Sequence, residues 1–251
     1  MDFSSYKTEY DTQGFVVIRE FLPPHELDRL QRELQRYIRE VVPTLPDGDA
    51  FYEDRSRPET LKQMHRLEQD AFFADYLREP RWRLVAEALL GEPIQPPQNA
   101  EWFNKPPLTN HITPPHQDNY YFCLKPPQVL TIWLALDAVD EENGCLRYIP
   151  GSHHLGIRPH GRTQTLGFSQ GILDYGEADY AKEVAITAQP GDALIHHGNT
   201  IHRADANRSS TRQRRSFGVV CRGVSCQRDE NAYERYLQSV RGQQAALGLK
   251  I

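Results

Sequence analysis

The sequence of 251 residues predicts a mainly β fold, a sandwich or barrel with flanking helices. Short strand-like runs recur from about residue 94 onward, separated by Pro, Gly and Asn. Helical patterns dominate the part before them, and no repeat, low-complexity tract or linker divides the chain. We therefore expect one domain over residues 1–251, with a helical N-terminal portion at about 24–92, a β core at about 94–224 and a C-terminal helix at about 230–241.

The N-terminal portion opens with an apolar, strand-like run at residues 14–18. After two prolines, apolar residues recur at spacings of three and four, at positions Leu27, Leu30, Leu34 and Ile38. This periodicity predicts an amphipathic helix over residues 25–42. Further helices are expected at 60–69 and 82–90, and the Pro, Asp and Gly content of 43–57 predicts a loop.

Seven strand-like runs make up the expected β core, at residues 100–104, 117–124, 129–137, 145–149, 183–187, 192–197 and 216–222. The run at 129–137 is apolar on both parities, which is typical of a strand buried on both faces. Adjacent residues on a strand point in opposite directions, so at most one of His196 and His197 can face a common site. We interpret both of these histidines as structural.

Composition excludes several classes of function. Lys and Arg number 29 against 34 Asp and Glu, so the net charge is −5 and no general basic surface is expected for nucleic acid or anionic membrane. The longest apolar stretch, 129–139, is far short of the about 20 residues that cross a bilayer. The four cysteines form no Cys-x-x-Cys pair, and the N-terminus does not resemble a signal peptide. We expect a cytoplasmic protein with a small-molecule ligand.

His116 and Asp118 lie two residues apart, so on a strand they would project from the same face. This pair alone is weak evidence, because hydrogen-bonded His–Asp pairs are a common structural feature. His202 lies far downstream, after the turn at residues 190–192 and the strand that follows it. Two histidines and one carboxylate from distant strands can occupy one face of an Fe(II) octahedron and leave positions open. Zinc more often has a closed site or a third histidine.

A basic run precedes the strand at 216–222. Arg214 shares its parity with Ser216 and Gly218, and these small residues predict a cavity on that face. An arginine at the mouth of a cavity offers a planar fork that matches a carboxylate, so Arg214 is a candidate carboxylate clamp. Arg212 and Arg215 are interpreted as solvated surface residues.

The chain resembles the phytanoyl-CoA dioxygenase (PhyH) family of Fe(II)- and 2-oxoglutarate-dependent oxygenases over most of its length. The residues that carry the resemblance occur in family order at 14–22, 105–107, 115–119, 133–137, 143–146, 149–153, 190–192, 201–202, 207 and 214–215. Any one of these motifs would be weak evidence, whereas their joint occurrence in this order is specific.

The resemblance implies a double-stranded β-helix, the jelly roll of cupin-like proteins, with helices on one side. It assigns His116, Asp118 and His202 as iron ligands and Arg214 as the salt-bridge partner of 2-oxoglutarate. It also places further residues near that co-substrate, namely Lys105, Gln117, Thr131 and Trp133. The sequence departs from the family pattern in two places. Arg203 stands where glycine is frequent, and a longer stretch after Asn207 leaves the choice among Arg212, Arg214 and Arg215 open.

The resemblance implies a dioxygenase that uses Fe(II), 2-oxoglutarate and dioxygen to oxidise a C–H bond of a small molecule. Such an enzyme is a hydroxylase or a related oxidoreductase. The co-substrate would be decarboxylated to succinate and CO2. Halogenating relatives replace the acidic ligand, so the presence of Asp118 favours hydroxylation or another oxidation. Two alternatives stay open: a cupin-like metal-dependent isomerase or hydrolase, and a catalytically idle binding protein of the same fold. The prime substrate is not readable from the sequence.

Overall fold

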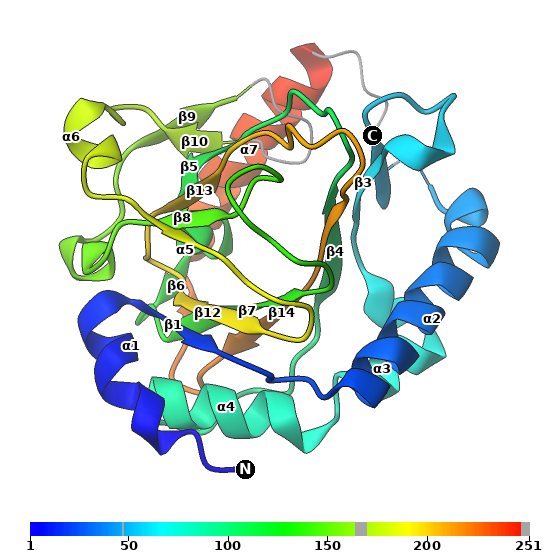
Figure 1. Cartoon of the computed structure of the whole chain (residues 1–251). Coiled ribbons are helices and arrows are strands. Elements are labelled where there is room, and N and C mark those ends of the chain that lie inside the picture. Colours follow the sequence, from blue (N-terminus) through cyan, green and yellow to red (C-terminus); the bar gives the residue numbers. More distant parts are fainter. Residues whose placement is uncertain (47, 164–169, 247–251) are drawn as a thin grey trace.

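The computed structural model describes residues 1–46, 48–163 and 170–246. Its centre is a seven-stranded antiparallel sheet in the order β1-β12-β7-β14-β4-β3-β2, which lies beneath a four-stranded sheet in the order β11-β8-β13-β5 (Figure 1). The large sheet comprises β1 (Phe15–Ile18), β2 (Ala50–Tyr52), β3 (Leu61–Met64), β4 (Ala100–Lys105), β7 (Val129–Ala135), β12 (Ala193–His197) and β14 (Arg214–Arg222). The small sheet comprises β5 (Thr113–His116), β8 (Leu146–Tyr148), β11 (Val184–Ile186) and β13 (His202–Ala204).

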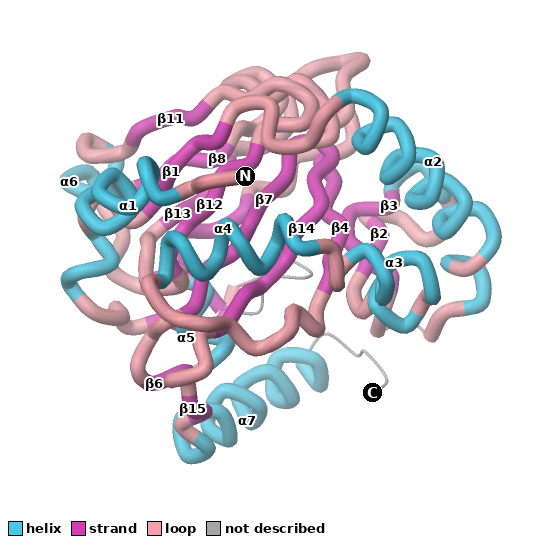
Figure 2. The backbone as a smooth tube through the Cα atoms, turned by 90° about the horizontal axis from the view of Figure 1, so that it is seen from below, coloured by secondary structure: helices cyan, strands magenta, loops and turns pink. Residues whose placement is uncertain are grey.

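Helices cover the outer face of the large sheet (Figure 2). They are α1 (Lys7–Gln13), α2 (Pro24–Glu40), α3 (Ala71–Tyr76) and α4 (Pro80–Leu90). Trp82 of α4 and Phe217 of β14 are fully buried, and their ring centroids lie 6.4 Å apart. Burial of one such side chain stabilises the fold by about 1.5–3 kcal/mol. With this face filled by the helices, the other face of the sheet is left to form the site.

The remaining strands and α-helices lie outside the large sheet, the small sheet and the helical layer. They are two ribbons, β6 (Leu124–Lys125) with β15 (Gln227–Arg228) and β9 (His160–Arg162) with β10 (Gln170–Ile172), and the helices α5 (Asp118–Phe122), α6 (Glu177–Tyr180) and α7 (Glu230–Ala246). Helix α7 packs against α5, where the rings of Tyr236 and Tyr121 lie 5.7 Å apart. None of the helices in the described ranges is long and apolar enough to cross a bilayer.

Most of the predicted elements are confirmed. The strand at 14–18 corresponds to β1, the helices at 25–42 and 82–90 to α2 and α4, and the C-terminal helix at 230–241 to α7. Six of the seven predicted core strands are present as β4, β7, β8, β11, β12 and β14, with ends shifted by up to two residues. The two strands that carry His116 and His202, β5 and β13, were not predicted. Consecutive prolines in β5 conceal its strand character, because proline cannot donate to the sheet.

Three predicted elements are wrong. Residues 60–69 are not a helix, since Leu61–Met64 is strand β3 and pairs with β4 and β2. The predicted loop at 43–57 supplies β2, so the portion expected to be helical also extends the sheet. All four residues of β3 are buried, which shows that sheet pairing overrides the local pattern here. Residues 117–124 are not a strand either, because Asp118–Phe122 forms helix α5.

Candidate active site

His116 and His202 lie side by side on adjacent strands. The register of β5 and β13 pairs them directly, and their ring centroids are 4.1 Å apart. Nδ1 of His116 lies 2.7 Å from the carbonyl of Pro114, and Nδ1 of His202 lies 3.0 Å from that of Thr200. A carbonyl can only accept, so each Nδ1 carries the proton and each Nε2 presents a lone pair. This tautomer is the one that a metal-binding histidine needs.

Asp118 reaches the same point from the first residue of α5, and not from a strand as the sequence predicted. The backbone N–H of Asn119 donates to the carbonyl of Gly198 at 2.8 Å, and its side-chain amide donates to Oδ1 of Asn199 at 3.1 Å. These bonds fix the start of α5 against the loop between β12 and β13. Oδ1 of Asp118 then lies 3.4 Å from Nε2 of His116 and 3.6 Å from Nε2 of His202.

The second carboxylate oxygen of Asp118 is held by two residues of the large sheet, Thr131 and His196. The hydroxyl of Thr131 donates to Oδ2 at 2.5 Å, and Nε2 of His196 lies 3.1 Å from it. His196 also contacts the hydroxyl of Tyr148 through Nδ1 at 2.9 Å. His196 is the site residue that the sequence interpretation missed. Its register partner on β7 is Thr131, which was expected to line the site. This pairing arises in the sheet and leaves no signal in the local sequence pattern.

His116, Asp118 and His202 form a donor set suited to a divalent metal. Their ligand atoms all lie within 4.8 Å of one another, and His116 and His202 are buried. Burial, together with the His116 and His196 imidazoles, holds the pKa of His202 well below its usual range, so this ring is neutral. Burial opposes ionisation of Asp118, but the hydrogen bond with His196 helps to hold the pKa of its carboxyl well below the usual range. Neutral imidazoles and an ionised carboxylate are what Fe(II) binds.

Arg214 faces the same cavity, which has a volume of about 480 Å³. Its side chain is 4% exposed, its Cζ lies 5.4 Å from the centre of the Trp133 ring, and its Nε has no hydrogen-bond partner in the described part of the chain. Burial lowers the pKa of Arg214 to about 10, so the guanidinium remains charged at neutral pH. The buried cation therefore has room and charge for an incoming carboxylate.

The neighbouring arginines do not compete for this position. Arg212 forms an ion pair with Asp140 at 2.8 Å, and Arg215 forms one with Asp137 at 2.6 Å. Both arginines lie outside the cavity lining. Among the three candidates, Arg214 alone lines the cavity that also contains His116, Asp118 and His202.

The remaining predicted residues divide into two groups. Lys105, Thr131 and Trp133 line the cavity, and Nζ of Lys105 donates to the carbonyl of His111 at 2.7 Å. Gln117 is fully buried outside the lining, and its amide donates to the carbonyls of Gly156 and Asn199. Its contacts join loops, so we correct the expectation and leave Gln117 out of the co-substrate site.

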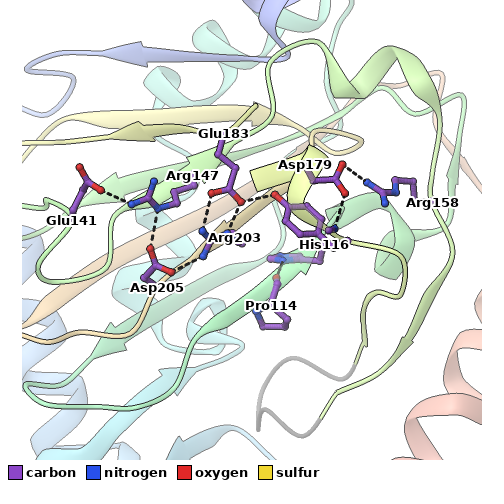
Figure 3. A network of polar contacts seen from close by, with 11 residues as sticks. Pro114, His116, Glu141, Arg147, Arg158, Asp179, Glu183, Arg203 and Asp205 are labelled. Carbon is purple, nitrogen blue, oxygen red and sulfur yellow. Dashed lines mark hydrogen bonds and ion pairs between the residues drawn. The ribbon is translucent and has the colours of Figure 1, made fainter. Parts of the chain in front are cut away.

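Arg203, where the family often has glycine, belongs to an ion-pair cluster on the outer side of the small sheet (Figure 3). Its guanidinium donates to both oxygens of Glu183 at 2.5 and 2.7 Å and to Asp205 at 2.5 Å. Asp205 in turn accepts from Arg147 at 2.9 Å. Because Arg203 and His202 are consecutive on β13, their side chains point to opposite faces. The departure from the family pattern therefore leaves the ligand face unchanged.

Residues 10–216 match the model of the family described as phytanoyl-CoA dioxygenase (PhyH). The chain belongs to this family. It is 27% identical over 215 residues to the peroxisomal phytanoyl-CoA dioxygenase of Bos taurus, a match that covers 80% of this chain and 63% of that protein. It is 25% identical over 219 residues to a probable alpha-ketoglutarate-dependent hypophosphite dioxygenase of Stutzerimonas stutzeri, covering 84% and 76%. The chain thus spans less than two thirds of the bovine family member.

The solved structure of EvdO2 from Micromonospora carbonacea var. aurantiaca, complexed with 2-oxoglutarate, is similar to this chain with a TM-score of 0.71. The two are 25% identical, and the match covers 89% of this chain and 91% of EvdO2. The two facing antiparallel sheets and this similarity confirm the predicted double-stranded β-helix.

Proposed function

We propose that the chain is an Fe(II)- and 2-oxoglutarate-dependent dioxygenase in which His116, Asp118 and His202 hold the iron. Arg214 binds the carboxylate of 2-oxoglutarate that lies away from the metal. One observation carries this proposal: the donor set opens onto a cavity that also contains a buried guanidinium with no carboxylate partner among the described residues. A metal-dependent isomerase or hydrolase with the same ligands would have no use for that guanidinium.

When bound, Fe(II) and 2-oxoglutarate supply the oxidising chemistry, in which dioxygen, decarboxylation to succinate and CO2, and oxidation of a substrate C–H bond are coupled. The chain positions both partners. Thr131 and His196 hold one oxygen of Asp118, so the other faces the histidines. Trp133 lies against the guanidinium of Arg214, and Nζ of Lys105, the register partner of Arg214 on β4, is held by the carbonyl of His111. These contacts keep the groups in place before the reactants arrive.

The prime substrate is a small molecule that enters the same cavity. Aromatic side chains of α5 and α7 form one wall, namely Tyr121, Phe122, Tyr233 and Tyr236. A carboxylate ligand is present at position 118, which favours hydroxylation or a related oxidation over halogenation. We place the protein in the cytoplasm, because its four cysteines are free thiols, as is usual in a reducing compartment.

The test uses purified protein supplied with Fe(II) and 2-oxoglutarate. We expect one iron per chain and succinate formation that depends on 2-oxoglutarate. His116→Ala, Asp118→Ala and His202→Ala should each abolish turnover and weaken iron binding while far-UV circular dichroism is retained. His197→Ala is the matched control, because His197 lies outside the cavity lining.

Normal succinate formation in His202→Ala would contradict the assigned ligands, and loss of iron in His197→Ala would show that the distal histidine is wrongly chosen. Iron binding without any 2-oxoglutarate binding would support the isomerase or hydrolase alternative. Protein that stays metal-free at full iron supply would support an idle binding protein.

A further inference from the structure

The cavity lining contains more cationic than anionic side chains. Its cations among the described residues are Lys62, Lys105, Arg214, Arg222 and Arg228. Its two carboxylates are both engaged, since Asp118 serves the proposed metal and Oε1 of Glu101 lies 2.9 Å from Nδ1 of His65. Under the proposed function, 2-oxoglutarate brings one carboxylate for the metal and one for Arg214. The other cationic side chains of the lining are then free to interact with the prime substrate.

Lys62 is the most deeply buried of these cations without a partner. The residue is 9% exposed, and its Nζ is buried with no hydrogen-bond partner in the described ranges. The charge of Glu53 acts against the lowering of the Lys62 pKa by burial, but the Glu53 carboxylate accepts a hydrogen bond from the hydroxyl of Thr109 at 3.1 Å. A buried ammonium without a partner destabilises a fold, so its presence in a cavity points to a ligand that completes it.

Arg222 and Arg228 also lack an ion-pair partner among the described residues, but other interactions partly stabilise their charges. Arg222 lies 5.5 Å from the centre of the Phe122 ring, and Arg228 lies 4.2 Å from that of Tyr233. Arg222 is half-buried and Arg228 is exposed, so water also solvates them. Cation–π contact and hydration make these arginines stable without an anion.

Lys62 lies beside the proposed 2-oxoglutarate site and not within it. Arg214 and Lys105 are register partners on β14 and β4, whereas Lys62 belongs to β3, on the far side of β4. From Lys62 the lining continues along the same segment through Gln63 and His65. The family resemblance places none of these three residues near the co-substrate.

We propose that Lys62 binds an anionic group, a carboxylate or a phosphate, of the prime substrate. This inference rests on the proposed function, because the substrate must share the cavity with 2-oxoglutarate. A lysine ammonium is a compact point charge that either anion satisfies. The apolar body of the substrate then packs against Phe103 and the aromatic wall of α5 and α7. The enzyme thus oxidises an acidic organic molecule.

The experiment measures binding by calorimetry to protein loaded with Fe(II) and saturating 2-oxoglutarate in the absence of dioxygen. The probes are butanoate, hexanoate, octanoate, hexyl phosphate and the n-alcohols of the same chain lengths. In the parent protein we expect at least one acid to bind about tenfold more tightly than its alcohol. Lys62→Met should remove this preference, and Lys62→Arg should retain part of it. Lys182→Met, at an exposed position outside the lining, is the control and should keep it.

Two further readouts separate a binding role from a structural one. Lys62→Met should leave the affinity for 2-oxoglutarate within about twofold of the parent value. Its thermal unfolding midpoint should equal or exceed that of the parent, because the variant removes an unpaired buried charge. A lower midpoint with an intact acid preference would assign Lys62 a structural role and overturn the inference.

Three other outcomes also overturn it. Acids and alcohols could bind the parent equally, Lys62→Met could weaken 2-oxoglutarate instead of the acids, or Arg222→Gln could abolish an acid preference that Lys62→Met leaves intact. Failure of the proposed function would appear earlier, as absence of 2-oxoglutarate binding in the parent before any acid is added.

Discussion

The hydroxyl of Thr131 donates a 2.5 Å hydrogen bond to Oδ2 of Asp118, which directs the opposite oxygen, Oδ1, toward His116 and His202. The donor lies on β7 of the large sheet, while both histidines lie on the small sheet. A residue of the large sheet therefore orients Asp118 toward the two histidines of the small sheet. A carboxylate with one oxygen already bonded is suited to bind a metal through the other.

Removing this hydrogen bond should weaken metal binding without loss of the fold. We expect Thr131→Val, which keeps the shape of the side chain, to lower the Fe(II) affinity by about 10- to 100-fold. Thr131→Ser should restore most of it, because the hydroxyl returns. Thr12→Val removes a hydroxyl bonded on the exposed side of α1 and is the control. An iron titration that gives equal affinities for Thr131→Val and the parent would contradict the positioning role.

The three arginines around β14 should differ sharply in their effect on 2-oxoglutarate affinity. Truncation of one partner of a buried charge pair costs about 2–5 kcal/mol, so Arg214→Ala should weaken binding roughly thirtyfold to several-thousandfold. Arg214→Lys should recover only part, because an ammonium lacks the planar fork. Arg212→Ala and Arg215→Ala should bind 2-oxoglutarate like the parent, since their partners are Asp140 and Asp137. If Arg212→Ala lost 2-oxoglutarate binding while Arg214→Ala bound it normally, the assignment of Arg214 to the co-substrate would be refuted.

The ion pair behind the small sheet should contribute to stability and not to chemistry. The side chain of Glu183 is 3% exposed and that of Arg203 is 13% exposed. Arg203→Met leaves the buried carboxylate without its cation and should destabilise the fold by about 3–5 kcal/mol. The double variant Arg203→Met/Glu183→Leu should regain most of this loss. Urea unfolding of the two variants checks the expectation, which equal losses in both would contradict.

Acid should destabilise the fold partly through His197. Burial and the neighbouring His153 lower the pKa of His197 to about 4 in the folded chain, below its ordinary value near 6.5. The unfolded chain therefore binds the proton first as the pH falls. The contribution is fully present above about pH 6.5 and is lost as the pH drops toward 4, by at most about 1.4 kcal/mol per pH unit.

His197→Asn should flatten this dependence, which urea midpoints measured between pH 7 and 4 would show. Some slope should remain in the variant, because burial also lowers the pKa of His160 to about 4. A parent protein whose stability is constant over this range would refute the prediction.

The sequence alone determined much of the candidate site. Ligand chemistry is local, so His116, Asp118 and His202 could be chosen from residue type and motif order, and the structure brings them together. Strand alternation is local too, and it correctly separated Arg214 from Arg215 on β14. The helices α2 and α4 followed from apolar periodicity, which also depends on near neighbours in the chain.

Only the tertiary structure decided the rest. Asp118 reaches the histidines through a helical turn that hydrogen bonds to a loop about eighty residues downstream fix in place. His196 faces Asp118 because β12 pairs with β7, and Lys62 reaches the cavity because β3 joins β4. Strand order and register arise from long-range pairing and burial, whose free energy is shared among residues far apart in sequence. A local pattern contains no record of which distant strand will lie beside it.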